Sequence, residues 1–183
     1  MQTRQGQVKK TLLVPPTTKE FGLFLIFTLA SLALRAQVTG SANIMATIVS
    51  PIGIDKSVDL DFGNVAGGSN PGTVVVTPSG TRSKTGGVTL PGAAGSVAAA
   101  AFIVTGVPNV TYSITLPYDP LPITCSGNSM TVGLFSSDPA GIGYLGPGGS
   151  QELHIGATLN VAALQPIGLY SSQAPFNVTV NYN

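Results

Sequence analysis

The chain has 183 residues, a formal net charge of +1 and only 8% charged residues, far below the roughly 25% of ordinary soluble domains. Residues 37–183 hold three cations and six acids, a net charge of −3, which excludes nucleic-acid binding because that class needs a basic surface. The length predicts one domain, and the 23 glycines and 14 prolines favour strands and turns over helices.

The N-terminal segment has the three parts of a secretory signal peptide. Four cations, the last of them Lys19, precede an uncharged apolar run over residues 21–34, and Arg35-Ala36-Gln37 follows. The sequence therefore predicts a signal peptide over residues 1–36, with cleavage after Ala36. A membrane anchor is the alternative, but the run has 14 residues and a spanning helix needs about 17–25. We expect no stable membrane span after the signal is removed.

Residues 37–183 predict one all-β domain of about eight to ten short strands. The apolar segments are separated by turns rich in Gly, Pro, Asn and Asp at spacings of roughly 8–15 residues, which is typical of an antiparallel sandwich or barrel. In chain order, the predicted strand segments are 37–54, 58–65, 73–78, 95–106, 110–117, 123–128, 129–136, 151–161 and 169–183. The segments TPSGTRSKTGG (77–87) and SDPAGIGYLGPGGS (137–150) are predicted to be loops.

Two segments, one at each end of this domain, alternate apolar and polar residues. Such a period of two indicates a strand with one buried face. In the first segment the apolar row is Val38, Ala42, Ile44, Ala46 and Ile48, and in the second it is Phe176, Val178, Val180 and Tyr182. The first row leaves two alternatives open: residues 37–49 are a donor-type strand that inserts into another subunit, or they are the domain's own first strand.

Candidate ligand-binding residues are few. Asp59 and Asp61 lie two apart in VDLDFGN, so in a strand they would share a face and are weak candidates for a calcium site; solvated surface acids are the alternative interpretation. Arg82 and Lys84 form a basic spot too small for membrane anchoring. The single cysteine, Cys125, is interpreted as a small apolar residue, with an intermolecular bridge or a reactive thiol as the alternative.

No catalytic or cofactor-binding constellation is found. His154 is the only histidine, and no nucleophile motif or metal-spaced partner accompanies it. The segment GIGYLG matches the letters of a dinucleotide fingerprint, but PGGS follows where a helix would have to begin. We therefore predict that the protein is not an enzyme and binds neither a cofactor nor a metal.

Seven motifs follow one another over residues 46–183: ATIVSPIGI, LDFGNVAGG, GTVVVTPSGTRSKTGGV, AAFIVTGVPNVTYSITLP, NSMTVGLFSS, LHIGATLNV and GLYSSQAPFNVTVNYN. This succession resembles a bacterial secreted family, the domain-of-unknown-function family 4402. The resemblance implies export in Gram-negative bacteria and a β-rich domain, with no assigned activity.

A weaker resemblance connects LDFG and the terminal GLY…VTVNY to spore coat protein U and to chaperone–usher pilin subunits. Those proteins have a penultimate aromatic residue, as Tyr182 is here, and a glycine comparable to Gly168. The resemblance implies an immunoglobulin-like sandwich that lacks one strand, which the N-terminal extension of a neighbour completes by strand addition.

These observations predict an exported, non-enzymatic structural protein, a subunit of a surface fibre, coat or extracellular matrix. The expected partners are like subunits or a periplasmic assembly chaperone, and the expected location is the periplasm, the cell surface or the medium. The proposed contact strands carry Val38, Ala42, Ile44, Ala46 and Ile48 on one side and Val178, Val180 and Tyr182 on the other. The alternative is a monomeric adhesin or glycan-binding module that uses its loops, where Tyr118 and Tyr144 are expected.

Overall fold

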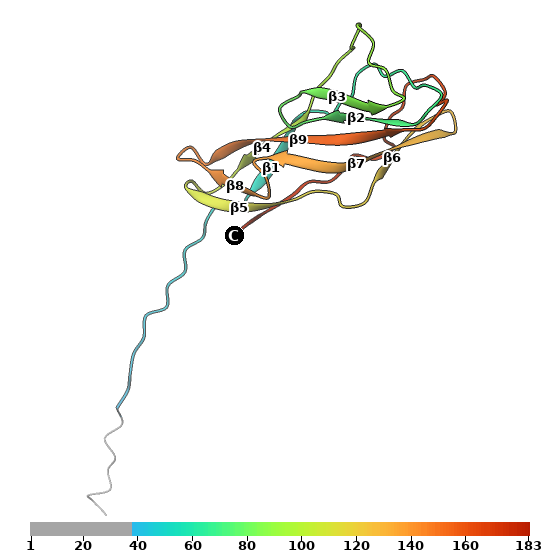
Figure 1. Ribbon diagram of the computed structural model, residues 1–183. Coiled ribbons are helices and arrows are strands. Elements are labelled where there is room, and N and C mark those ends of the chain that lie inside the picture. Colours follow the sequence, from blue (N-terminus) through green and yellow to red (C-terminus); the bar gives the residue numbers. More distant parts are fainter. Residues whose placement is uncertain (1–37) are drawn as a thin grey trace, which may run out of the picture. The chain divides into compact units, whose positions relative to one another are not determined.

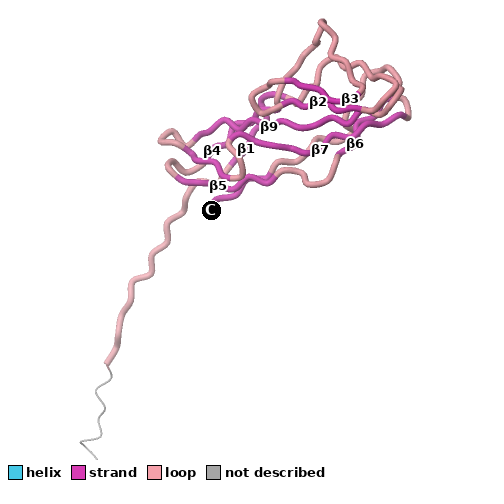
Figure 2. The backbone as a smooth tube through the Cα atoms, in the orientation of Figure 1, coloured by secondary structure: helices cyan, strands magenta, loops and turns pink. Residues whose placement is uncertain are grey.

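The computed structural model describes residues 38–183, and within this range it contains ten strands and no helix (Figure 2). The all-β prediction is confirmed. The predicted signal peptide, its cleavage after Ala36 and Gln37 lie outside the described residues. The chain divides into a segment that ends at Ala46 and a compact unit, Thr47–Asn183, that holds every strand. The strands are β1 (Gly53–Val58), β2 (Gly72–Val76), β3 (Arg82–Gly86), β4 (Ala100–Thr105), β5 (Val110–Thr115), β6 (Leu121–Cys125), β7 (Asn128–Asp138), β8 (Ile142–Leu145), β9 (Ser150–Val161) and β10 (Thr179–Tyr182).

The long strand β9 organises the larger of two antiparallel sheets (Figure 1). Along one edge, its first half pairs with β4 and its second half pairs with β2, while β7 pairs with its other edge. Strands β1, β3 and β6 lie outside β4, β2 and β7. The smaller sheet has the order β10-β5-β8.

This order is that of an immunoglobulin-like sandwich. Such a sandwich has strands A-B-E-D in one sheet and C-F-G in the other. Taken in chain order, β1, β4, β5, β7, β9 and β10 occupy positions A to F, because β1-β4-β9-β7 forms one sheet and β5 pairs with β10 in the second. Position G, beside β10, has no strand among residues 38–183.

The core lies on the face of β9 that carries its odd-numbered residues. Leu153 and Ile155 are fully buried in one apolar cluster, whereas Leu159 and Val161 belong to a second cluster beneath β2 and β7. Burying one such side chain stabilises the fold by about 1.5–3 kcal/mol. The predicted burial of the apolar row at 176–182 is confirmed, because all four of these side chains belong to or pack against the first cluster and the polar ones between them are exposed. The predicted strand over 169–183 was too long, since β10 covers only Thr179–Tyr182.

Two segments predicted to be loops contain strands. The range 77–87 holds β3, and the range 137–150 holds β8, so the loop prediction for Tyr144 was wrong. Strand β3 is almost entirely exposed and carries no apolar row; it forms because its backbone pairs with β2. The predicted strand at 58–65 was wrong as well, since β1 ends at Val58 and only Asp61 makes an isolated bridge beyond it.

The buried Tyr112 makes the stability of the fold sensitive to alkali. Its side chain is fully buried and its hydroxyl donates to Gln151 Oε1 over 2.9 Å, and burial raises the pKa of this phenol above its ordinary value of 10.0. The folded state therefore holds the proton more tightly than the unfolded state, so the unfolding free energy should fall as the pH rises above 10. Urea titrations between pH 8 and 11 should show this fall, and a Tyr112→Phe variant should show a smaller one.

Candidate assembly edge

Five strands lie at the ends of the two sheets, and four of them carry features that hinder pairing with another chain. Strand β3 carries Arg82 and Lys84, and β1 carries Asp55 and Lys56; charged residues protect exposed edges. Strand β6 is bridged at its outer edge, where Thr124 exchanges two backbone hydrogen bonds with Ser171.

A side chain covers the outer edge of the fourth strand, β8. Gln151 Oε1 accepts the backbone N–H of Tyr144 over 2.7 Å and also the hydroxyl of Tyr112. An N–H group that would be free at a sheet edge is therefore already bonded within the domain. This leaves β10 as the end strand of the described chain that has no charged residue, no bridging segment and no side chain bonded to its outer edge.

The backbone of β10 alternates between its paired and its open edge. Asn183 donates its N–H to Thr111 of β5, and Asn181 lies opposite Ser113. Because bonding residues alternate in an antiparallel ladder, the N–H and C=O groups of Val180 and Tyr182 point to the opposite edge. No strand among residues 38–183 pairs with that edge, so these groups are free to bond an incoming strand.

Val180 of β10 is buried, but the other apolar side chains next to this edge are only partly covered. Phe176 contacts Phe102 with ring centroids 6.2 Å apart and Phe135 with centroids 5.2 Å apart, and all three are half-buried, as are Val178 and Tyr182. Side chains deeper in the same cluster, by contrast, are fully buried. The core is thus closed beneath β9 and incompletely covered beside β10.

The hydroxyl of Tyr182 connects three distant parts of the chain. It accepts the backbone N–H of Val107 over 2.8 Å and donates to the carbonyl of Ser50 over 3.0 Å. Gly106 leaves room for this hydroxyl, since a Cβ at that position would collide with it. These contacts hold Ser50 at the end of β10 where Tyr182 lies.

Residues 38–49, which we call the arm, lie immediately before Ser50 and form no strand. Every residue of the arm is exposed, and Val38, Ile44 and Ile48 have exposed fractions of 94%, 98% and 97%. Exposure of large aliphatic side chains in an alternating row is unfavourable in water. An alternating apolar row of this kind is what strand addition to another sheet edge requires. Met45, also exposed, interrupts the polar row.

The two weak calcium candidates, Asp59 and Asp61, are each bonded to a neighbouring residue. Asp59 binds Lys56 Nζ at 2.5 Å, and Asp61 Oδ1 accepts the N–H of Gly63 over 2.7 Å. Each carboxylate therefore has a local partner of its own. No group of three or more residues that could hold a metal occurs in the described part of the chain.

The remaining polar candidates are His154 in β9 and Cys125 in β6. His154 Nε2 is 3.6 Å from Glu152 Oε2 on the outer face of β9, and the histidine side chain has an exposed fraction of 39%. Cys125 is free and partly buried in β6, with Gly168 so close that a Cβ there would collide with its Sγ.

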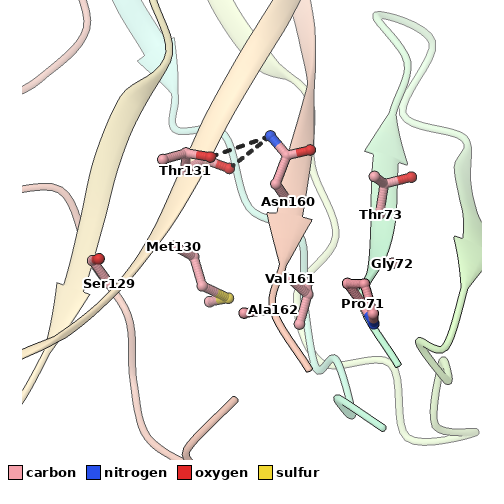
Figure 3. Close-up of a pocket in the computed structure, with 9 residues that line it drawn as sticks. All are labelled: Pro71, Gly72, Thr73, Ser129, Met130, Thr131, Asn160, Val161 and Ala162. Carbon is pink, nitrogen blue, oxygen red and sulfur yellow. Dashed lines mark hydrogen bonds between the residues drawn. The ribbon is translucent and has the colours of Figure 1, made fainter. Parts of the chain in front are cut away.

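A shallow hollow of about 500 Å³ lies where β2, β7 and β9 meet (Figure 3). The amide of Asn160 donates to the carbonyl and to Oγ1 of Thr131, so its donors are used within the hollow. Met130 also lines it, and no aromatic residue does. A sugar ring would therefore lack the flat apolar surface on which it usually stacks.

The two tyrosines expected in ligand-binding loops have different surroundings. Tyr118 lies outside the strands and has an exposed fraction of 96%. Tyr144 lies in β8, and its hydroxyl donates to Asn109 Oδ1 over 3.1 Å. No helix in residues 38–183 is long and apolar enough to cross a membrane.

The strand order and the open edge of β10 place the domain among the immunoglobulin-like β-sandwiches. Among the described residues, no strand occupies position G. The family model of the domain of unknown function DUF4402 matches residues 52–182, which is more than half of the chain. The protein belongs to that family. Searches of curated proteins and of solved structures found no match.

The sequence predictions located the arm and the β10 side chains, but they missed the residues that support them. Ser50, Gly106 and Val107 meet Tyr182 across long stretches of chain, and no local pattern marks such a contact. Phe102 and Phe135 lie in predicted strands, and their partial burial beside Phe176 becomes visible only when the two sheets are packed.

Proposed function

We propose that this protein is an exported, non-enzymatic structural subunit that assembles with like subunits by β-strand addition at the open edge of β10. The observation that carries the proposal is the coexistence of two complementary features in one chain. The edge offers free backbone groups above half-buried aromatic side chains, and the arm offers an exposed row of aliphatic ones. Strand addition satisfies the backbone of both and covers the apolar side chains of both.

The arm is long enough for this role. Its twelve residues span about 40 Å when extended, and the segment 176–182 spans about 23 Å, at roughly 3.3 Å per residue. Burying Val38, Ile44 and Ile48 would contribute about 1.5–3 kcal/mol for each side chain. The location that fits this role is the periplasm, the cell surface or an extracellular matrix, and an assembly chaperone would protect the edge before subunits join.

Light scattering on the chain purified natively from the periplasm tests the proposal. We expect masses that are multiples of the subunit, or a 1:1 complex with a chaperone. A variant that lacks residues 38–49 should lose the multiples and keep the same cooperative melt, because the arm is exposed and contributes no strand to the domain. A monomer at every concentration tested, with the arm present, would contradict the proposal.

The second candidate function is a monomeric adhesin or glycan-binding module, and the exposed ring of Tyr118 is the observation that favours it. Such a module would retain ligand as a monomer. Replacing Tyr118 or Tyr144 with alanine would then weaken retention on a glycan array without changing particle size. Under the leading proposal neither replacement changes assembly, because neither residue belongs to β10 or to the arm.

A further inference from the structure

Three large aliphatic side chains are exposed together on the segment between β9 and β10. Residues 162–170, which we call the apolar turn, carry Leu164, Ile167 and Leu169 at exposed fractions of 78%, 101% and 86%. Single exposed apolar side chains are common on protein surfaces and need no explanation. Three of them within six residues are a different case, because clustered apolar side chains mark interaction sites.

The apolar turn is fixed to the rest of the domain. Leu164 donates its N–H to the carbonyl of Gly68 over 2.8 Å, and Gln165 Nε2 donates to the carbonyl of Ser129 in β7 over 3.3 Å. The backbone of Leu164 has a φ of 54°, a left-handed conformation that leucine rarely adopts. Such strain persists only where the surrounding structure fixes the residue. The fold therefore directs these aliphatic side chains into solvent.

Several polar groups of the apolar turn are already bonded within the domain. The Tyr170 hydroxyl accepts a hydrogen bond from Gln165 Nε2 over 2.8 Å and donates to the carbonyl of Pro166 over 2.9 Å. Pro166 itself has no N–H group, and just beyond the turn Ser171 exchanges two backbone hydrogen bonds with Thr124. Internal bonding of this kind lowers the cost of moving a turn into a medium that offers no hydrogen bonds.

The chain segments that form this end of the domain are uncharged. The apolar turn contacts Gly67 and Gly68, Cys125 of β6 and Ser129 of β7. Residues 62–81, 120–137 and 155–183, which include all of these, contain no Asp, Glu, Lys, Arg or His. Binding to anionic lipid depends on clusters of Lys and Arg. The chemistry of this end is instead complementary to an uncharged apolar medium.

We propose that the apolar turn inserts its aliphatic side chains into the hydrocarbon of an electrically neutral lipid bilayer. A stable protein partner needs about 20–30 contact residues on each side, and three side chains on one turn offer far fewer. A bilayer has no such requirement, because its acyl chains move aside for side chains that reach about 5–10 Å below the headgroups. This contact is peripheral, and it does not depend on strand addition at β10.

A single introduced tryptophan tests the insertion at this turn. The chain has no tryptophan of its own, so Ile167→Trp reports only the surroundings of the turn. Leu134→Trp is the matched control, because Leu134 is 82% exposed but lies in β7. Each variant is mixed with phosphatidylcholine vesicles whose acyl chains carry bromine. The emission of Ile167→Trp should shift to shorter wavelength and be quenched, and that of Leu134→Trp should stay unchanged. Unchanged emission from Ile167→Trp would overturn the proposal.

Flotation with the same vesicles measures the affinity. Ile167→Ser should weaken vesicle binding by about tenfold or more, because one buried aliphatic side chain is lost, whereas Leu134→Ser should bind like the unchanged protein. Binding should be equal at low and high salt. Equal losses in the two serine variants, or a requirement for anionic lipid, would contradict the proposal. A shift of the Ile167→Trp emission with protein concentration alone would show that a second copy covers the turn instead.

Discussion

Replacing Ile44 with aspartate is expected to abolish assembly and to leave the folded domain intact. The Ile44 side chain is 98% exposed in the subunit, so the domain does not depend on it. In an assembled fibre the same side chain would enter the core beside β10. Burial of an unpaired carboxylate costs several kcal/mol, and each 1.4 kcal/mol weakens association tenfold, so the loss should be complete at ordinary concentrations.

The neighbouring residue provides the matched control. Asn43→Asp adds the same charge one residue away, on the outward face of the arm, and should assemble like the unchanged protein. Size-exclusion chromatography with light scattering measures the mass, and the thermal melt measures the domain. If Ile44→Asp assembled as well as Asn43→Asp, the even-numbered face of the arm would not be the inserted face.

The largest effect on stability is expected from Gly156→Ala in β9. The backbone of β2 passes so close to Gly156 that an added Cβ would collide with the carbonyl oxygen of Val76 and lie 2.7 Å from the nitrogen of Pro78. These are backbone atoms at the end of β2 and just after it, and they cannot move aside as the tip of a flexible side chain can. Overpacking of this kind costs about 1–3 kcal/mol, and more where the backbone must shift.

Gly148→Ala is the matched control for this prediction, because a Cβ at Gly148 would meet open space. Urea denaturation of both variants, fitted for midpoint and slope, gives the two free energies of unfolding. We expect the Gly156→Ala midpoint to fall well below that of the unchanged protein and the Gly148→Ala midpoint to stay near it. Equal midpoints for both variants would mean that β2 and β9 separate locally at little cost.

The sequence predicted those strands in which one face is buried. Alternation located 176–182 because each of its apolar side chains reaches the core, and β-branched and aromatic residues located β4 despite its alanines. Strands β3 and β8 were missed for a physical reason. Strand β3 forms by backbone pairing with β2, and a backbone hydrogen bond leaves no mark in the side-chain pattern of an exposed strand. Strand β8 does bury Leu145, but it has only four residues, one of them a glycine in a segment rich in turn residues, so its alternation is too short to distinguish it from a loop.

The open edge of β10 and the arm were predictable only in part, for a similar reason. The aliphatic row of the arm can be read directly from the sequence, because it is local. The open edge of β10 depends on where the other strands lie. The edge of β8 is closed by a single side chain, Gln151. Such contacts join residues that are distant in sequence, as Tyr182 and Ser50 are, and they follow from topology rather than from composition.

The single unprotected edge also determines the shape of any polymer built in the proposed way. A subunit with one arm and one open edge is a monomer of valency two with unlike ends, so growth is head-to-tail and cannot branch. Interfaces of that kind give rings when the rotation between subunits closes and open filaments when it does not. A filament would be polar, with a bare β10 at one terminus and a bare arm at the other. Its length would then be set by the ratio of terminating partners to subunits.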